Sequence, residues 1–155
     1  MLNTMIINGR IRMMKKVIVA AIVLPLSLMI SQVSAETISC VLENNKVVTA
    51  SNLASNPVYS YGTAGNVELS LPSSSANSRV YKGSEMFSGG GSTYLAFTNG
   101  AYTYVLYNGI GRDWEFEGLR VYKDAEIIVE KQCKQYGSTV FDYDAVHAPE
   151  GELPY

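Results

Sequence analysis

The chain has 155 residues, of which 47% are hydrophobic and 17% are charged, and its formal net charge is −2. Its 12 basic residues form no basic stripe and are outnumbered by 14 acidic residues, which argues against nucleic acid and against an anionic lipid surface as the partner. A cationic partner is compatible with this charge.

Residues 1–35 have the pattern of a secretory signal peptide. Lys15-Lys16 forms a short basic region, Val17 to Ile30 is an apolar run, and Val33-Ser34-Ala35 is a small-residue cleavage site. The apolar run is too short for a typical membrane-spanning helix. We therefore expect cleavage after Ala35, a periplasmic or secreted protein, and no stable membrane anchor after cleavage.

The chain that follows residue 35 is long enough for one domain with a modest core. It contains all 14 acidic residues but only 8 of the 12 basic ones, so its net charge is −6. We expect an all-β domain over residues 36–136. Residues 137–155 are acidic, contain Pro and Gly and show no periodicity, which predicts a mobile tail.

The first half of the domain is predicted to form four short strands. Apolar and polar residues alternate in a way that is typical of strands, and turn-forming residues separate the runs. In the fourth run Val67, Leu69 and Leu71 are expected to face the core, and Pro72 ends the strand. The four runs cover residues 37–43, 46–50, 58–61 and 67–71.

The second half is organised around a predicted β-hairpin. Its two runs, Ser92 to Thr98 and Ala101 to Tyr107, are rich in aromatic, aliphatic and β-branched residues. Asn99-Gly100 joins them, and Asn-Gly between two strand-like runs predicts a type I′ turn with positive φ at both central residues. Further strands are expected over residues 79–87, 119–123 and 126–134.

Together these runs predict an all-β fold, namely a small antiparallel sandwich or barrel of about eight strands. The two cysteines, Cys40 and Cys133, lie in the first and last strands and share a face with apolar neighbours. In an oxidising compartment two cysteines in a small domain form one disulfide most simply. We expect the Cys40–Cys133 bond to fasten the first strand to the last.

The sequence offers little for catalysis. The single histidine, His147, lies in the expected tail, and both cysteines are expected to be oxidised. Glu115 and Glu117 share one strand face, which is more typical of a solvated face than of a carboxylate pair across a cleft. The segment around Asp142 and Asp144 lacks the glycine and the distal glutamate of an EF-hand calcium loop. No enzyme activity, metal or cofactor is therefore expected.

A run of three glycines, at residues 89–91, precedes the organising hairpin. No Gly-Lys-Ser/Thr follows it, so it is not a phosphate loop. One interpretation is a bulge or a wide turn, and the alternative is close approach by a partner to backbone without side chains. On the second interpretation the partner-binding residues are Ser88, Gly89, Gly90, Gly91, Ser92 and Tyr94.

Tyrosine is unusually common, with 11 Tyr against 4 Phe and one Trp. A tyrosine buries area while it keeps a polar tip, so these residues fit either ordinary sheet packing or an aromatic surface for carbohydrate or protein. Trp114 follows a glycine-containing loop and is the best single candidate for an exposed anchor. The alternative role of Trp114 is a lid on the core.

Several motifs resemble small exported proteins of Gram-negative bacteria that carry no assigned activity. The resemblance covers about the last two-fifths of the chain after cleavage and implies export and a β fold. The residues that carry it are Phe87-Ser88-Gly89-Gly90-Gly91, Tyr94-Leu95, Asn99-Gly100, Tyr104-Val105, Gly109-Ile110-Gly111, Trp114 and Glu117-Gly118-Leu119.

A second resemblance is to the membrane-bound and periplasmic inhibitors of C-type lysozyme. It rests on the cysteine in the first strand, the Ser-Gly-x-x-x-x-Tyr segment from Ser88 to Tyr94, and the cysteine in the last strand. Those inhibitors are small β-barrels that insert a loop containing Ser and Gly into the cleft of the enzyme. The resemblance implies that Ser88, Ser92 and Tyr94 belong to such a loop.

The sequence thus favours a non-catalytic periplasmic or secreted binding protein, and lysozyme inhibition is its most specific version. The alternative is a carbohydrate-binding or structural module of the cell envelope, which would use Trp114 and exposed tyrosines. In both cases the expected partner is a protein or a glycan of the envelope.

Overall fold

The structure is a computed structural model and describes residues 36–74 and 78–155. The expected signal peptide, residues 1–35, lies outside the described residues. Within the described ranges, no helix has the length and apolar character needed to cross a membrane.

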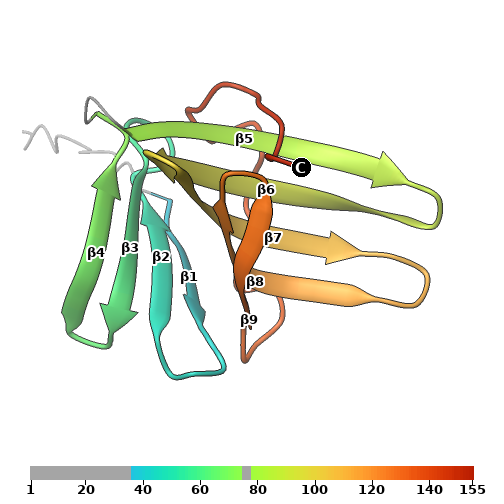
Figure 1. Ribbon diagram of the computed structural model, residues 1–155, viewed down its shortest axis with the longest axis horizontal. Helices are drawn as coiled ribbons and strands as arrows, with labels where there is room; N and C mark the ends of the chain where they lie inside the picture. The colour runs from blue at the N-terminus through green and yellow to red at the C-terminus, as the bar shows by residue number, and fades with distance from the viewer. Residues whose placement is uncertain (1–35, 75–77) are drawn as a thin grey trace, which may run out of the picture. The chain divides into compact units, whose positions relative to one another are not determined.

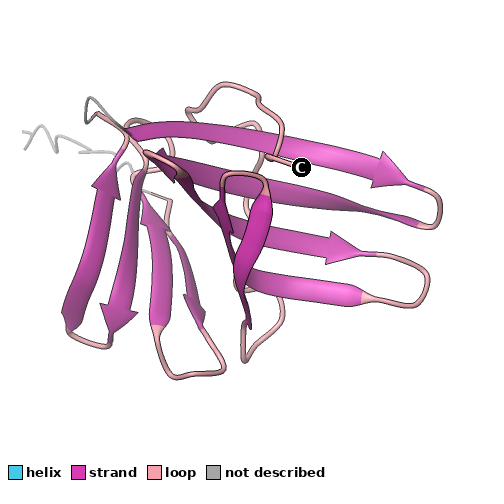
Figure 2. Cartoon of the chain, viewed as in Figure 1, coloured by secondary structure: helices cyan, strands magenta, loops and turns pink. Residues whose placement is uncertain are grey.

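Nine strands form two antiparallel sheets in the described part of the chain (Figures 1 and 2). Each sheet is a meander, because strands that follow one another in sequence are hydrogen-bonded neighbours. The all-β antiparallel prediction is confirmed. The four-stranded sheet contains β1 (Ile38–Val41), β2 (Val47–Ser51), β3 (Val58–Thr63) and β4 (Asn66–Pro72). The five-stranded sheet contains β5 (Ser78–Phe87), β6 (Gly90–Asn99), β7 (Tyr102–Ile110), β8 (Glu115–Lys123) and β9 (Glu126–Gln132).

The main core lies between the two sheets. Alternate residues of β6 separate the two faces of its sheet, since Leu95 and Phe97 face this core whereas Tyr94 and Ala96 pack on the opposite face. Tyr59 of β3 extends into this core from the four-stranded sheet, and the centroid of its ring lies 5.6 Å from that of Phe97. Other buried members of the main core are Ile38, Leu42, Val48, Leu53, Leu71, Leu106, Leu119 and Val121.

A disulfide joins Cys40 to Cys133, as predicted, with their Cα atoms 5.6 Å apart. Next to it, Leu42 and Cys133 form an antiparallel bridge, so β1 meets the end of β9. The first and last strands are thus fastened together both covalently and by backbone pairing. A disulfide-bonded all-β fold is compatible with an extracellular location.

The turn of the β6–β7 hairpin differs from the predicted type I′ turn. Asn99 pairs with Tyr102, so the two central residues are Gly100 and Ala101 rather than Asn99 and Gly100. Only Gly100 has a positive φ, of 61°. Glycine at the first central position, followed by a residue with negative φ, is the pattern of a type II′ turn, which also matches the twist of the strands.

The prediction that Val67 faces the core is wrong, because its side chain is 63% exposed. The pairing of β3 with β4 shifts here: Tyr61 pairs with Leu69, but Gly62 pairs with Val67. The extra residue of this β-bulge, Glu68, interrupts the alternation. Val67 is therefore out of phase with the buried Leu71.

Residues 137–155 differ from the mobile tail that the sequence predicts, because they pack against the five-stranded sheet. The ammonium group of Lys82 donates hydrogen bonds to the carbonyl oxygens of Tyr143 and Val146, at 2.7 and 3.0 Å. Val146 is buried in the core between the sheets, whereas Leu153 is buried on the opposite face of the five-stranded sheet. The C-terminal segment therefore passes around the edge of this sheet.

The edge that the segment covers belongs to β5. The backbone N–H of Lys82 donates to the carbonyl oxygen of Pro149 at 2.9 Å, and the N–H of Gly151 donates to the carbonyl oxygen of Lys82 at 3.0 Å. An open sheet edge is a template for pairing with other chains, and at Lys82 the C-terminal segment occupies the backbone groups of this edge.

Gly118 of β8 provides a test of the packing between β8 and β9. A Cβ atom at this position would overlap the carbonyl oxygen of Lys131 on the neighbouring strand. We expect Gly118→Ala to lower the free energy of unfolding by about 2 kcal/mol, because the backbone of β9 would have to move. Urea denaturation measures this loss, and Ser70→Ala at an exposed position of β4 is the control. An equal effect of the two substitutions would contradict the close approach.

Candidate functional site

Two neighbouring hairpins, β5–β6 and β7–β8, reach beyond the four-stranded sheet at the right of Figure 1. We call their ends, residues 86–91 and 110–115, the hairpin tips. The tips are neighbours because β6 pairs with β7, and Gly91 lies directly opposite Ile110. The candidate site of the sequence analysis falls largely on these tips.

Apolar side chains are exposed on both faces of the hairpin tips. Met86, Gly91 and Ile110 are in register, so the side chains of Met86 (89% exposed) and Ile110 (57% exposed) share one face. On the other face the ring of Trp114, 43% exposed, stacks on that of Phe87 with 5.5 Å between ring centroids. Contiguous exposed apolar surface on a small protein is typical of an interaction site.

The packing and backbone conformation of the chain itself require glycine at two positions of the first tip. Gly89 has a φ of 89°, in the left-handed region that favours glycine in a tight turn. A Cβ atom at Gly90 would overlap the carbonyl oxygen of Ile110, so the second hairpin could not approach as closely. These two glycines therefore position the two tips side by side.

Five of the seven predicted partner-binding residues fall into two groups, and the other two, Gly90 and Gly91, are half-buried in the first tip. Ser88 and Gly89 are exposed at the first tip, and Trp114 is exposed at the second. Ser92 and Tyr94 are buried on the face of the sheet that the C-terminal segment covers. The structure therefore does not bring Ser92 and Tyr94 to the exposed tip surface.

The carboxylates that the sequence places on one solvated face have different environments. Glu115 is exposed, but Glu117 is only 1% exposed. The Glu117 carboxylate accepts hydrogen bonds from the backbone N–H groups of Gly137 (2.7 Å) and Thr139. Glu117 therefore anchors the start of the C-terminal segment to β8, and sequence reasoning missed this role.

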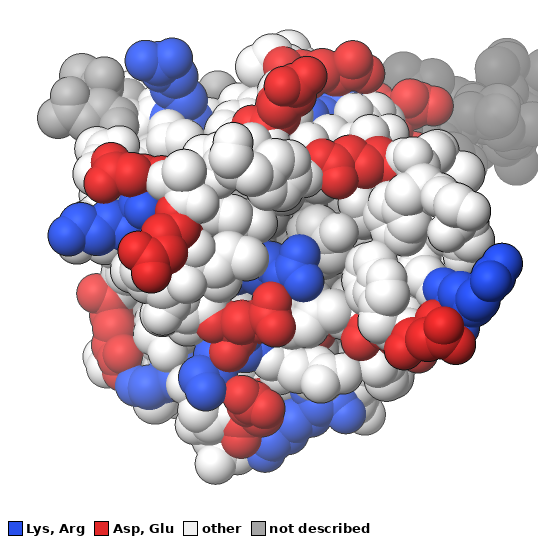
Figure 3. Space-filling model, turned by 45° about the vertical axis from the view of Figure 1, so that its right-hand side comes forward, with Lys and Arg blue, Asp and Glu red and all other residues white. Residues whose placement is uncertain are grey.

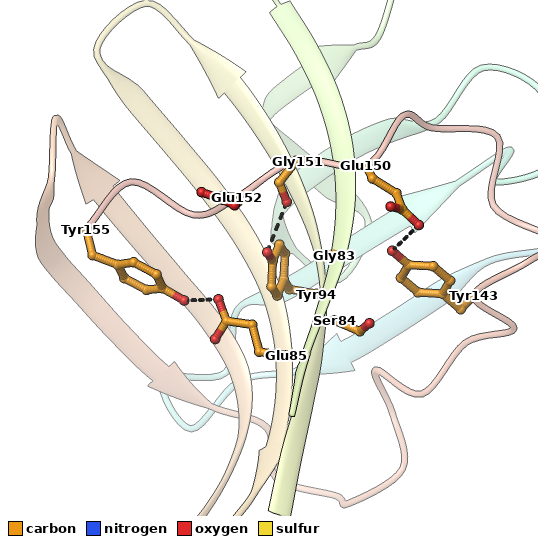
Figure 4. Close-up of a pocket in the computed structure, with 9 residues that line it drawn as sticks. All are labelled: Gly83, Ser84, Glu85, Tyr94, Tyr143, Glu150, Gly151, Glu152 and Tyr155. Carbon is orange, nitrogen blue, oxygen red and sulfur yellow. Dashed lines mark hydrogen bonds between the residues drawn. The ribbon is translucent and has the colours of Figure 1, made fainter. Parts of the chain in front are cut away.

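Apart from the hairpin tips, a hollow of about 450 Å³ lies at the edge of β5 (Figure 4). Its walls come from β5, from Tyr94 of β6 and from the C-terminal segment. The Tyr94 hydroxyl donates a hydrogen bond to the carbonyl oxygen of Gly151 at 3.0 Å. Burial of the Tyr94 hydroxyl is the main cause that raises its pKa to about 12, and the negative charge of Glu85 is the next. The hydroxyl therefore keeps its proton at neutral pH.

Charges of both signs are mixed on the face of the molecule shown in Figure 3. On the face shown in Figure 3, blue basic side chains are scattered among red acidic ones rather than gathered into one area. Three salt bridges occur among the described residues: Lys46–Glu68, Arg120–Glu130 and Lys131–Glu43. All three lie on strands or turns outside the tips and the hollow at β5.

Comparison of the chain with models of protein families, with curated protein sequences and with solved structures finds no match. The function is therefore argued from the geometry of the described residues. That geometry defines a disulfide-bonded all-β protein with two protruding hairpins and exposed apolar side chains at their tips.

Proposed function

We propose that the protein is a non-catalytic binding protein of the periplasm or the extracellular space, and that its hairpin tips enter a cleft on a partner protein. The observation that carries this proposal is the exposed apolar surface on both faces of two adjacent, protruding hairpins. A projection with two apolar faces can contact both walls of a cleft at once.

The most specific version is inhibition of a C-type lysozyme. The resemblance of the Ser88–Tyr94 segment to lysozyme inhibitors supports this version, and Ser88 lies in the exposed turn of the first tip. The net charge of −6 after cleavage suits a basic enzyme, because complementary charge accelerates the encounter of two proteins. The apolar side chains of Met86, Ile110 and Trp114 are exposed at the tips, so we assign the binding role to them as well as to Ser88.

A lysozyme lysis assay tests this proposal. We expect the exported, oxidised protein to inhibit lysis, and we expect Trp114→Ala to raise the half-inhibitory concentration about tenfold or more, because central aromatic anchors dominate binding energies. The double substitution Met86→Ser with Ile110→Ser is expected to have a similar effect through the opposite face. Val67→Ser is the matched control, since it removes an exposed apolar side chain from β4. Absence of inhibition at micromolar protein would overturn the lysozyme version.

A glycan is the second candidate partner, because the exposed Trp114 ring is braced by Phe87 and could stack on a sugar. Trp114 is the single tryptophan of the chain, so its fluorescence reports directly on this position. Saturable quenching by a chitin oligosaccharide, without any inhibition of lysozyme, would favour the glycan over the protein partner.

A further inference from the structure

A hollow of about 290 Å³ lies between the two sheets, and we call it the inter-sheet hollow. Its walls come from β3 and β4 of the four-stranded sheet and from β7, β8 and β9 of the five-stranded sheet. On β7 it is lined by Tyr102 and Tyr104, at the opposite end of the strand from Ile110 of the hairpin tips. Tyr104 and Ile110 are separated by about 20 Å of extended chain, so the hollow and the tips are separate sites.

The lining of the inter-sheet hollow is apolar and uncharged. It consists of tyrosine, leucine, valine and isoleucine side chains, and no acidic or basic residue is among the described residues that form it. Burial raises the pKa of Tyr59 and of Tyr104, so these hydroxyls are uncharged at neutral pH. A charged ligand would lose its water here without gaining a charged partner, which disfavours it.

Three tyrosine rings form a row from the interior to the mouth of the hollow. The ring centroids of Tyr59 and Tyr104 lie 5.2 Å apart, and those of Tyr104 and Tyr102 lie 6.5 Å apart. Tyr59 is buried, Tyr104 is half-buried and Tyr102 is 39% exposed. Aromatic rings at such distances attract one another, and the same rings offer stacking faces to a ligand.

The hollow extends from the surface into the main core. Leu119 and Val121, which line it, are buried members of that core, whereas Ile128 at its mouth is 47% exposed. Protein interiors are close-packed, with few voids larger than a water molecule. A hollow that opens the core to the surface is therefore unusual, and only a molecule small enough to enter between the sheets can reach its floor.

A β-bulge beside the hollow occurs in each of the two sheets and provides an independent indication of a site. In β4 the extra residue is Glu68, next to Leu69 of the lining. In β9 it is Ile128, which has no partner on β8 and lines the hollow together with Val129. Bulges redirect side chains and are frequent next to active sites. Two edge strands thus depart from regular pairing at the place where they border this space.

We propose that the inter-sheet hollow binds an uncharged, apolar small molecule of one or two rings. Its volume lies at the lower end of the range for ligand pockets, which favours a small ligand. The apolar walls bind the body of this ligand, and the tyrosine hydroxyls are the polar side-chain groups that can hydrogen-bond to a substituent on it. This inference does not depend on the partner of the hairpin tips.

Calorimetric titration of the oxidised protein with 2-naphthol tests the proposal, because this probe has two fused rings and is uncharged at neutral pH. We expect saturable binding with a Kd below about 1 mM. We expect 2-naphthoate, which has the same rings and a negative charge, to bind about tenfold more weakly or worse.

Two substitutions that fill the hollow locate the binding of 2-naphthol. Val129→Phe adds a ring from β9 and should weaken binding about fivefold or more, because it occupies the space of the ligand. Leu69→Phe does the same from the four-stranded sheet and provides a second reading if the first variant is not folded. The matched control is Ile127→Phe, because Ile127 pairs with Tyr122, which packs on the opposite face of the sheet. The control should change the affinity less than about twofold.

Binding of 2-naphthol at the hairpin tips is tested separately. The double substitution Met86→Ser with Ile110→Ser should leave the affinity unchanged, and circular dichroism establishes that each variant is folded. Loss of binding in this double variant, or equal effects of Val129→Phe and Ile127→Phe, would overturn the proposal. Equal affinities for 2-naphthol and 2-naphthoate, or no saturation below about 10 mM, would overturn it as well. The result of the lysis assay affects none of these comparisons.

Discussion

Replacement of both cysteines by alanine is expected to lower the free energy of unfolding by about 4–5 kcal/mol. The bond joins residues separated by 93 positions, so it removes much of the conformational freedom of the unfolded chain. The two strand ends that it joins are also the only place where β1 and β9 pair within the described residues. Urea denaturation of the two proteins, with the slope and the midpoint both fitted, measures the difference.

The wild-type protein under reducing conditions is the control for this double substitution, because it loses the bond but keeps the sulfur atoms. It should unfold at nearly the same urea concentration as the alanine variant. A loss of less than about 1 kcal/mol would show that the unfolded chain is restricted by other means than the disulfide.

Glu117→Ala is expected to lower the free energy of unfolding by about 3 kcal/mol, because it removes a buried hydrogen-bond acceptor. The carboxylate is buried and accepts N–H groups of Gly137 and Thr139, and Thr139 is itself buried. Loss of the acceptor leaves the buried N–H of Thr139 without a partner, which is unfavourable. Glu117→Gln retains one acceptor oxygen and should cost less.

Limited proteolysis checks where the stability is lost. The C-terminal segment of the Glu117→Ala variant should be cleaved faster than that of the wild type, because its anchor on β8 is gone. Glu115→Ala is the matched control, since it truncates an exposed glutamate two residues earlier on the same strand. Equal stability of the two variants would contradict the anchoring role of Glu117.

Much of the fold was predictable from local pattern. Alternation of apolar and polar residues locates the strands, because each strand buries one face or both. The cysteine pairing was predictable because both cysteines share a face with core residues such as Ile38 and Val129. The exact turn at Gly100 and the bulge at Glu68 were not, since a shift of one residue depends on pairing rather than on composition.

The C-terminal segment could not be predicted for a related reason. It is held by isolated contacts, among them the buried side chains of Val146 and Leu153, the backbone and ammonium hydrogen bonds of Lys82, and the Glu117 carboxylate. Such contacts leave no period in the sequence, and the acidic, proline-containing composition is equally typical of a mobile segment. The prediction that Glu117 is solvated was wrong because its partners are backbone groups of this same segment.

The candidate site was predicted in part. The sequence signals at Ser88, Gly89 and Trp114 locate the hairpin tips, because glycines and an isolated tryptophan stand out in composition. Met86 and Ile110 carried no signal, since an apolar residue in a strand is ordinarily buried. The hollow at β5 was missed entirely because half of its lining comes from the segment that was expected to be mobile.

Hydrogen exchange of the oxidised, exported protein, alone and with a C-type lysozyme, tests most directly whether the hairpin tips are the binding surface. We expect slower exchange of backbone amides in residues 86–91 and 110–115 when the enzyme is present, and little change in β2 and β3. Unchanged exchange at both tips, or protection confined to the C-terminal segment, would contradict the assignment of the tips as the binding surface.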